Sequence, residues 1–209
     1  MKGGMRMCRR GWIIRGMGVL LVVSMCVTEG LLLMQGRWRE AIPLHLCSVS
    51  AIVAFFVSLG AQGDALDFLW YLGLPGALLA LIFPAPAVSS HQALFNASYA
   101  VTHALIVLIP LAAIAEGTRP REGRAARMLL LLHGLAFTAF FVNEALGTDF
   151  LFLSAPPAGT PLEPLFALGY PVYLLFLDGM MIVLCLVQSA AAHRLTRLFE
   201  AVQIRKNAL

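Results

Sequence analysis

Charged residues are scarce in this chain. They make up 12% of its 209 residues, whereas soluble domains usually carry about 25%. Hydrophobic residues account for 60% of the sequence, and the mean hydropathy is +0.83. The alternating segments of about ten residues that mark a membrane barrel are also lacking, because the apolar runs approach 20 residues. The composition therefore excludes a soluble domain and predicts an all-α, polytopic membrane protein.

Cysteine and metal-binding motifs are limited as well. Only four cysteines occur, at positions 8, 26, 47 and 185, and three of them lie in predicted membrane spans, so no disulfide framework is implied. HExxH and CxxC spacings are absent from the sequence, and we predict neither a metal site nor a cofactor. The basic residues flank apolar runs instead of alternating with aromatic residues, which argues against a nucleic-acid partner.

Six apolar runs predict a bundle of six transmembrane helices that forms a single membrane domain over residues 1–209. The first run resembles a signal peptide, but no small-x-small cleavage site follows it, so we interpret it as an uncleaved span. Pro43 is expected at the first helical position of the second span. The sequence Gly73-Leu74-Pro75-Gly76 is expected to kink or interrupt the third. The predicted spans are approximately 13–34, 43–60, 66–83, 94–115, 128–146 and 171–192.

The distribution of basic residues predicts the orientation. Six spans place both termini on one side of the membrane, and lysine and arginine concentrate on the cytoplasmic side of membrane proteins. Thirteen of the fifteen basic residues fall on the side of the termini, and only Arg37 and Arg39 fall on the other. We therefore predict a multi-pass membrane protein with both termini in the cytoplasm; the bacterial inner membrane is the location that the family resemblance given below implies.

This topology gathers polar side chains in the outer half of the membrane, where polar groups without partners are costly. Cys47 shares a seam of small residues with Ser50, Ala54 and Ser58, and this seam is expected to face the bundle interior. His45 lies about 200° away around the same helix. The other polar residues at this depth are Glu29, Asn96, Tyr99, His103, Asn143, Glu144 and Asp178.

Cys47 and His103 are the candidate catalytic pair. A thiolate is the reactive form of cysteine, and a nearby histidine base generates it in an apolar environment. Either Asp178 or Glu29 is a candidate to orient the imidazole ring. Asn143, or backbone N–H groups near Ser48, are candidates to hold an oxyanion. We expect His45 and Tyr99 to complete this polar pocket on the extracytoplasmic side.

Each of these residues also has a purely structural interpretation. A membrane cysteine often acts as a small packing residue, and we assign Cys26 and Cys185 in that way. His103 would then hydrogen-bond a neighbouring helix, Glu29 and Asp178 would pair with other spans, and Asn143 would cap its helix. His133 is expected at the cytoplasmic interface.

Five sequence segments carry a resemblance to a known family. They are IPLHLCS, LGLPGALLALIFP, YAVTHALIV, NEALGTDFLFL and LGYPVYLL, in this order. Over roughly residues 37–186 the chain resembles the YwaF-like family of bacterial integral membrane proteins. That family is related to a mammalian transmembrane acyltransferase of ether-phospholipid remodelling, and remotely to androgen-induced hydrolases of fatty-acid esters of hydroxy fatty acids. Asp149-Phe150 and Tyr170-Pro171 depart from its usual pattern.

The resemblance implies six spans and a cysteine-histidine pair that works through an acyl-thioester, and these two positions map onto Cys47 and His103. It implies a lipid acyltransferase or lipid-ester hydrolase whose partners are membrane lipids, either phospholipid or lysophospholipid. Two other interpretations remain open. One is a non-enzymatic protein that binds or transports lipids or small molecules, and the other is a structural subunit of an envelope complex.

Overall fold

The computed structural model describes residues 2–84, 91–157 and 159–207. Within these ranges it contains helices and no strand, which confirms the predicted all-α class. The elements are α1 (Lys2–Met34), α2 (Leu46–Ser58), α3 (Asp64–Phe68), the π-helical segment η1 (Leu69–Gly73), α4 (Leu74–Ile82), α5 (Gln92–Ala115), α6 (Ala125–Leu146), the 3-10 turn η2 (Phe150–Phe152), α7 (Glu163–Phe166) and α8 (Tyr170–Asn207).

Five helical stretches among the described residues are long and apolar enough to cross a membrane. The predicted second span is the exception, because α2 has only 13 residues. At about 1.5 Å per residue it covers roughly 20 Å, less than the hydrocarbon core of about 30 Å. The expected helical start at Pro43 is wrong: the Leu44 N–H bonds the Ile42 carbonyl in a tight turn, and His45 is the residue that precedes the helix.

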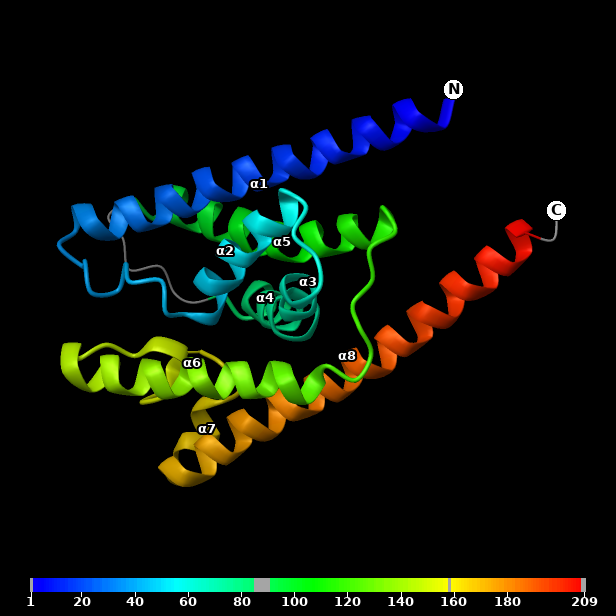
Figure 1. The fold of residues 1–209 in the computed structure, drawn as a ribbon. Coiled ribbons are helices and arrows are strands. Elements are labelled where there is room, and N and C mark those ends of the chain that lie inside the picture. The colour runs from blue at the N-terminus through cyan, green and yellow to red at the C-terminus, as the bar shows by residue number, and fades with distance from the viewer. Residues whose placement is uncertain (1, 85–90, 158, 208–209) are drawn as a thin grey trace.

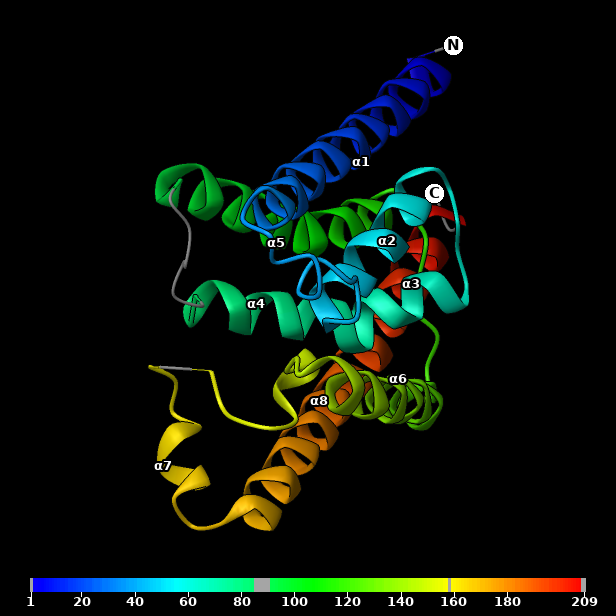
Figure 2. The same cartoon turned by 90° about the vertical axis from the view of Figure 1, so that its left-hand side faces the viewer.

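The helices form three layers (Figures 1 and 2). In both views α1 and α5 lie above, the continuous stretch α3-η1-α4 lies in the middle with α2 beside it, and α6 and α8 lie below. The middle stretch is seen nearly end-on in Figure 1 and across the view in Figure 2, so it crosses α6 steeply. The start of α1 and the end of α8 lie at the same end of the molecule; the side of the membrane on which the termini lie stays a prediction.

The centre of the core is a π-helical turn. Leu69, Tyr71 and Leu72 of η1 are fully buried, and Trp70 donates its indole N–H to the Gln188 carbonyl on α8. Pro75 has no N–H for the carbonyl of Tyr71 four residues earlier, and the thiol of Cys185 on α8 donates to that carbonyl at 3.7 Å. The disturbance predicted at residues 73–76 lies earlier in the structure, as the π-helical segment Leu69–Gly73, and a neighbouring helix supports it as membrane helices require.

The upper layer is held by small and hydroxyl-bearing residues. Ser24 and Thr28 of α1 share hydrogen bonds of 2.8 Å with Thr102 and Ser98 of α5, respectively. The seam residues Ser50, Ala54 and Ser58 of α2 are buried, as expected. A Cβ atom on Gly18 of α1 would overlap the Ser58 side chain, so these two helices touch closely there.

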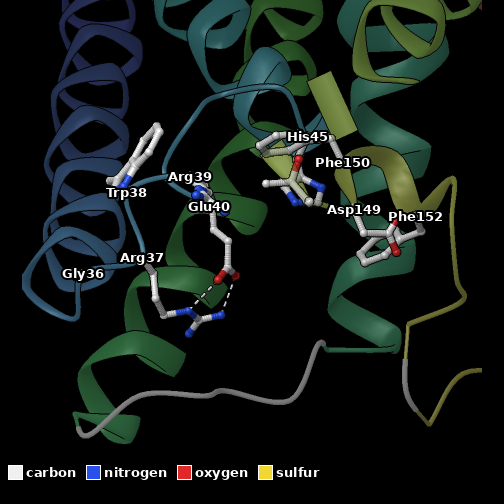
Figure 3. Close-up of a pocket in the computed structure, with 11 residues that line it drawn as sticks. Gly36, Arg37, Trp38, Arg39, Glu40, His45, Asp149, Phe150 and Phe152 are labelled. Carbon is white, nitrogen blue, oxygen red and sulfur yellow. Dashed lines mark hydrogen bonds and ion pairs between the residues drawn. The ribbon is translucent and has the colours of Figure 1, made fainter. Parts of the chain in front are cut away.

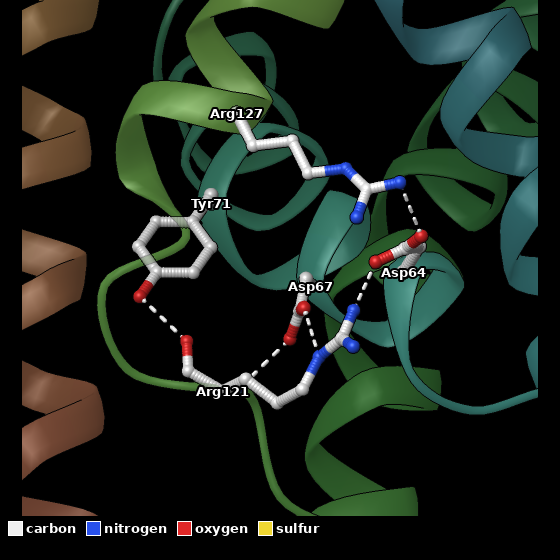
Figure 4. Close-up of polar contacts among 5 residues, drawn as sticks. All are labelled: Asp64, Asp67, Tyr71, Arg121 and Arg127. Carbon is white, nitrogen blue, oxygen red and sulfur yellow. Dashed lines mark hydrogen bonds and ion pairs between the residues drawn. The ribbon is translucent and has the colours of Figure 1, made fainter.

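Asp67 fastens the loop between the upper and lower layers. Its carboxylate is fully buried and accepts hydrogen bonds from the backbone N–H and the Nε of Arg121, at 2.7 and 2.8 Å. Tyr71 donates its hydroxyl to the Arg121 carbonyl (Figure 4). Asp64, which is half exposed, pairs with Arg121 and Arg127 at the edge of the cluster.

We predict that Asp67→Asn destabilises the protein far more than Asp64→Asn. The first substitution leaves an amide group facing the Arg121 guanidinium in a buried site, whereas the second weakens an exposed ion pair. Thermal unfolding in detergent should show a melting temperature lowered by roughly 6–12 °C for Asp67→Asn and by less than about 3 °C for Asp64→Asn. Equal shifts would contradict the assigned anchoring role.

Gly18→Ala should destabilise the contact between α1 and α2 because the added methyl group overlaps Ser58, whose hydroxyl already bonds the Phe55 carbonyl. Overpacking of this kind costs about 1–3 kcal/mol. Gly16→Ala is the matched control, since a Cβ atom at Gly16 meets no neighbour within 4 Å. Denaturant unfolding of both variants measures the difference, and a Gly18 variant as stable as the Gly16 variant would rule out the close approach.

Candidate active site

Cys47 is the second residue of α2, because the helix begins at Leu46. It is therefore closer to the helix start than the predicted span implied. The side chain is partly buried and packs against the core, and the Ser48 hydroxyl lies beside the thiol. The first backbone N–H groups of a helix have no partner within it and carry partial positive charge. The thiol thus lies where the local dipole favours a negative charge.

His103 lies on α5 and is 3% exposed. Its Nδ1 is 2.8 Å from the Tyr99 carbonyl, and its ring stacks on the Tyr99 ring with centroids 4.0 Å apart. A carbonyl only accepts hydrogen bonds, so the Nδ1 carries the proton and the Nε2 has a free lone pair. The Nε2 has no hydrogen-bond partner within the described residues. This neutral tautomer suits a base.

The structure does not join the two candidates by a hydrogen bond. Helix α2 packs against α5, but among the described residues the Cys47 sulfur makes no hydrogen bond with either ring nitrogen of His103. The catalytic pair therefore stays a prediction.

Two buried polar atoms near Cys47 lack a partner. Within the described part of the chain, the Glu29 Oε2 and the Ser50 Oγ are the buried side-chain oxygen or nitrogen atoms without a hydrogen bond. The Glu29 carboxylate acts electrostatically on the Cys47 thiol, and Ser50 lies one helical turn after Cys47 on the buried face. Buried groups of this kind mark places where water or a ligand binds, so the surroundings of Cys47 have unused hydrogen-bonding capacity.

A pocket of about 710 Å³ opens just before α2. Its walls come from two loops that are far apart in sequence, with His45 between Arg39 and Asp149 in Figure 3. The lining residues are Gly36, Arg37, Trp38, Arg39, Glu40, His45, Gly147, Thr148, Asp149, Phe150 and Phe152. Arg39 ties the two loops together by donating to the Leu146 carbonyl at the end of α6, at 3.0 Å.

His45 is held by the loop that follows α6. Its Nδ1 accepts the Leu151 N–H at 3.4 Å, and its ring contacts Phe150 and Phe152 with centroids 5.1 and 5.5 Å apart. Burial lowers the pKa of His45, against the opposing effect of the Asp149 and Glu40 carboxylates. The ring is thus neutral at neutral pH, and because its Nδ1 accepts, its proton is on the Nε2.

Two other predicted site residues, Asn143 and Tyr99, hydrogen-bond to backbone or loop groups and not to Cys47 or His103. Asn143 uses its amide to hold the following loop: its oxygen accepts from the Thr148 hydroxyl and the Phe150 N–H, and its nitrogen donates to the Phe150 carbonyl. This matches its alternative role as a helix-end cap and leaves little capacity for an oxyanion. The Tyr99 hydroxyl donates to the Ala80 carbonyl of α4 at 3.2 Å.

Asp178 pairs with a histidine, but not with His103. Its carboxylate lies 3.1 Å from the Nε2 of His133 on α6, while the Nδ1 of His133 bonds the Leu129 carbonyl. His133 lies within α6 and pairs across to α8; its expected place at the cytoplasmic interface stays a prediction. Glu29 is the remaining acid near Cys47.

Sequence reasoning missed the walls of the pocket. Arg37 and Arg39 were the two basic residues that fell on the side opposite the other thirteen, and both line the pocket. Their departure from the positive-inside pattern was the available signal. At Asp149 the available signal was the departure of Asp149-Phe150 from the family pattern, but its place in the pocket depends on a loop that Asn143 holds.

The comparisons with known proteins decide the family. Residues 3–188 match the model of the TMEM164 family. The chain belongs to the TMEM164 family. An uncharacterized protein of Treponema pallidum (strain Nichols) is 30% identical to it over 131 residues. That match covers 60% of this chain and 52% of the relative, so the chain spans about half of that protein's length. No solved structure matches.

Asn143→Ala should free the loop of this TMEM164-family chain that follows α6, because it removes both the acceptor and the donor that hold Phe150. Losing buried hydrogen bonds costs about 1–3 kcal/mol, so amide hydrogen exchange across residues 148–152 should accelerate about tenfold or more. Glu144→Ala is the control, since Glu144 is exposed on the same helix. Unchanged exchange in the Asn143 variant would refute the anchoring.

Proposed function

We propose that this TMEM164-family chain is a membrane-embedded lipid acyltransferase or lipid-ester hydrolase that works through Cys47 and His103. One observation carries the proposal: the Tyr99 carbonyl takes the Nδ1–H of the buried His103 and leaves its Nε2 as the basic nitrogen, on a helix that packs against α2, whose first turn holds Cys47. The resemblance to the YwaF-like family and its acyltransferase relative points to the same two residues. Membrane lipids are the proposed substrates.

In the first half-reaction, the Nε2 of His103 accepts the thiol proton and the Cys47 sulfur attacks the carbonyl carbon of a lipid ester. The tetrahedral intermediate collapses with cleavage of the carbon-oxygen ester bond, which leaves the acyl group on sulfur. The departing lysolipid oxygen takes the proton from His103. The products of this half-reaction are an acyl-thioester on Cys47 and a lysolipid with a free hydroxyl.

In the second half-reaction, a lysolipid hydroxyl or water gives its proton to the Nε2 of His103 and attacks the thioester carbon. The carbon-sulfur bond breaks, and the Cys47 thiolate recovers the proton from His103. Transfer to a lysolipid gives a new ester, and transfer to water gives a fatty acid. Both outcomes restore the starting protein.

The oxyanion of both intermediates needs hydrogen-bond donors. The backbone N–H groups of Cys47 and Ser48 lie beside the thiol, and the first N–H groups of a helix lack internal partners. We assign the oxyanion to these groups because the Asn143 amide is occupied by its own loop. The Tyr99 carbonyl, which accepts the Nδ1–H of His103, orients the imidazole ring in place of an acid.

The proposal includes the location. The charge distribution of the sequence supports cytoplasmic termini and a site toward the extracytoplasmic side, and the resemblance to a bacterial membrane-protein family supports the bacterial inner membrane. In that orientation Cys47 reaches lipids of the outer leaflet.

Cys47→Ala should abolish acyl release and transfer from labelled phospholipid by the purified protein in nanodiscs, because no sulfur remains to form the thioester. His103→Gln should lower the rate by about 10²–10⁴-fold. Cys26→Ala is the control, since Cys26 is an exposed cysteine on α1 and should leave the rate unchanged. Mass spectrometry of the wild type should detect the acyl group on the peptide containing Cys47.

Melting temperatures of all three variants separate loss of chemistry from loss of folding. A folded Cys47→Ala protein that still releases or transfers the acyl group would refute the mechanism.

A further inference from the structure

A histidine and a carboxylate pair between the two helices of the lower layer. The Nε2 of His133 on α6 lies 3.1 Å from one oxygen of Asp178 on α8, and the two side chains are 56% and 44% exposed. The Nδ1–H of His133 donates to the Leu129 carbonyl, whereas the other Asp178 oxygen has no hydrogen-bond partner among the described residues. That oxygen is therefore left for a donor from outside the described chain.

The pair lies far from both ends of the apolar part of α8. Asp178 is the only charged residue of the sequence between Glu163 and Arg194. Along α8 it is roughly 12 Å from Tyr170 and roughly 24 Å from Arg194. Both α6 and α8 are long and apolar enough to cross a membrane, whose hydrocarbon core is about 30 Å thick. When α8 crosses the membrane, the pair thus lies inside the hydrocarbon layer.

The surface around the pair is apolar. Four large apolar side chains lie about one helical turn before and after the pair, two on each helix, and all four are exposed: Leu130, Phe137, Leu175 and Ile182. Lipid chains cover such side chains without cost. They offer no hydrogen bond to a half-exposed carboxylate or imidazole, and polar groups without partners are expensive inside a membrane. A polar surface, and not lipid, is therefore the favourable cover for His133 and Asp178.

We propose that a second copy of this chain covers the pair, and that α6 and α8 form the interface of a two-fold symmetric dimer within the membrane. In this proposal His133 lies deeper than the cytoplasmic interface first expected for it. Two copies inserted in the same orientation are related by an axis along the membrane normal, which keeps every residue at its own depth. His133 and Asp178 share one depth because they pair. The axis therefore sets His133 of each copy opposite the free Asp178 oxygen of the other.

Complementarity of acid and base favours a second copy over other occupants. The covering surface has to offer a base to the carboxylate and an acid to the imidazole, both at one depth in the hydrocarbon layer. An unrelated helix needs its own polar residues at that depth, whereas a second copy supplies both groups by symmetry. The four side chains then form a ring in which each His133 lies between two Asp178 carboxylates, and interhelical hydrogen bonds of this kind favour association of membrane helices. This interface does not depend on the chemistry proposed for Cys47.

Energy transfer between two labelled populations of the full-length protein tests the dimer. Protein with a donor fluorophore at its C-terminus and protein with an acceptor there are reconstituted together into phosphatidylcholine vesicles at several protein-to-lipid ratios. We expect transfer that saturates as the ratio rises and that depends linearly on the acceptor fraction, as a dimer requires. Transfer that never exceeds the level of random proximity would overturn the proposal.

A double variant, His133→Leu with Asp178→Leu, makes this face wholly apolar. We expect its self-association to be about tenfold weaker or more, because lipid then covers the face as well as protein does. Thr138→Val is the matched control: Thr138 is exposed on α6, but its hydroxyl bonds the Gly134 carbonyl of the same helix, so association should not change. Melting temperatures in the same vesicles establish that both variants are folded. A folded double variant that associates like the wild type contradicts the assigned interface.

Cysteine cross-linking locates the interface while the pair stays intact. The background variant replaces Cys8 and Cys26 with alanine. In this background, Phe137→Cys on α6 should give a disulfide-linked product of twice the chain mass when membranes are oxidised. Val19→Cys on α1 should not, although Val19 and Phe137 are similarly exposed, at 61% and 68%. Equal cross-linking at Val19, or a product at Phe137 that contains only another protein, would show that a second copy does not cover this face.

Discussion

The buried carboxylate of Asp67 is the constraint on which the arrangement of the layers depends. The loop between α5 and α6 passes from the upper layer to the lower one, and Arg121 in that loop gives Asp67 both a backbone and a side-chain hydrogen bond. A buried carboxylate without these donors is strongly unfavourable. The central stretch can therefore keep its place only with the loop attached, and α6 begins a few residues later.

Much of the fold was predictable because membrane helices are long apolar runs. The ends of α1, α5 and α6 at Met34, Ala115 and Leu146 agree with the predicted spans. The start of α2 was not predictable from Pro43, since a proline suits a tight turn as well as a first helical turn. The π-helical form of residues 69–73 also depends on tertiary contacts, notably the Cys185 thiol that satisfies the Tyr71 carbonyl.

The part of the candidate site that could be predicted is the part in which helical phase decides which side chains face the bundle interior. Burial of Ser50 and Ala54 confirms the seam, and the separate direction of His45 fits its place in the pocket. Helical phase does not identify which residue a side chain contacts, however. The sequence therefore could not predict that Asp178 pairs with His133 or that Asn143 bonds its own loop. The pairing of Cys47 with His103 as a catalytic dyad stays a prediction for the same reason.

The shortness of α2 has a consequence for the surrounding bilayer. A helix of 13 residues covers roughly 20 Å of a hydrocarbon core of about 30 Å, and membranes respond to such mismatch by thinning locally or by admitting polar groups. The pocket opens at the start of this short helix, so a bilayer that thins to match α2 brings its headgroups toward the pocket.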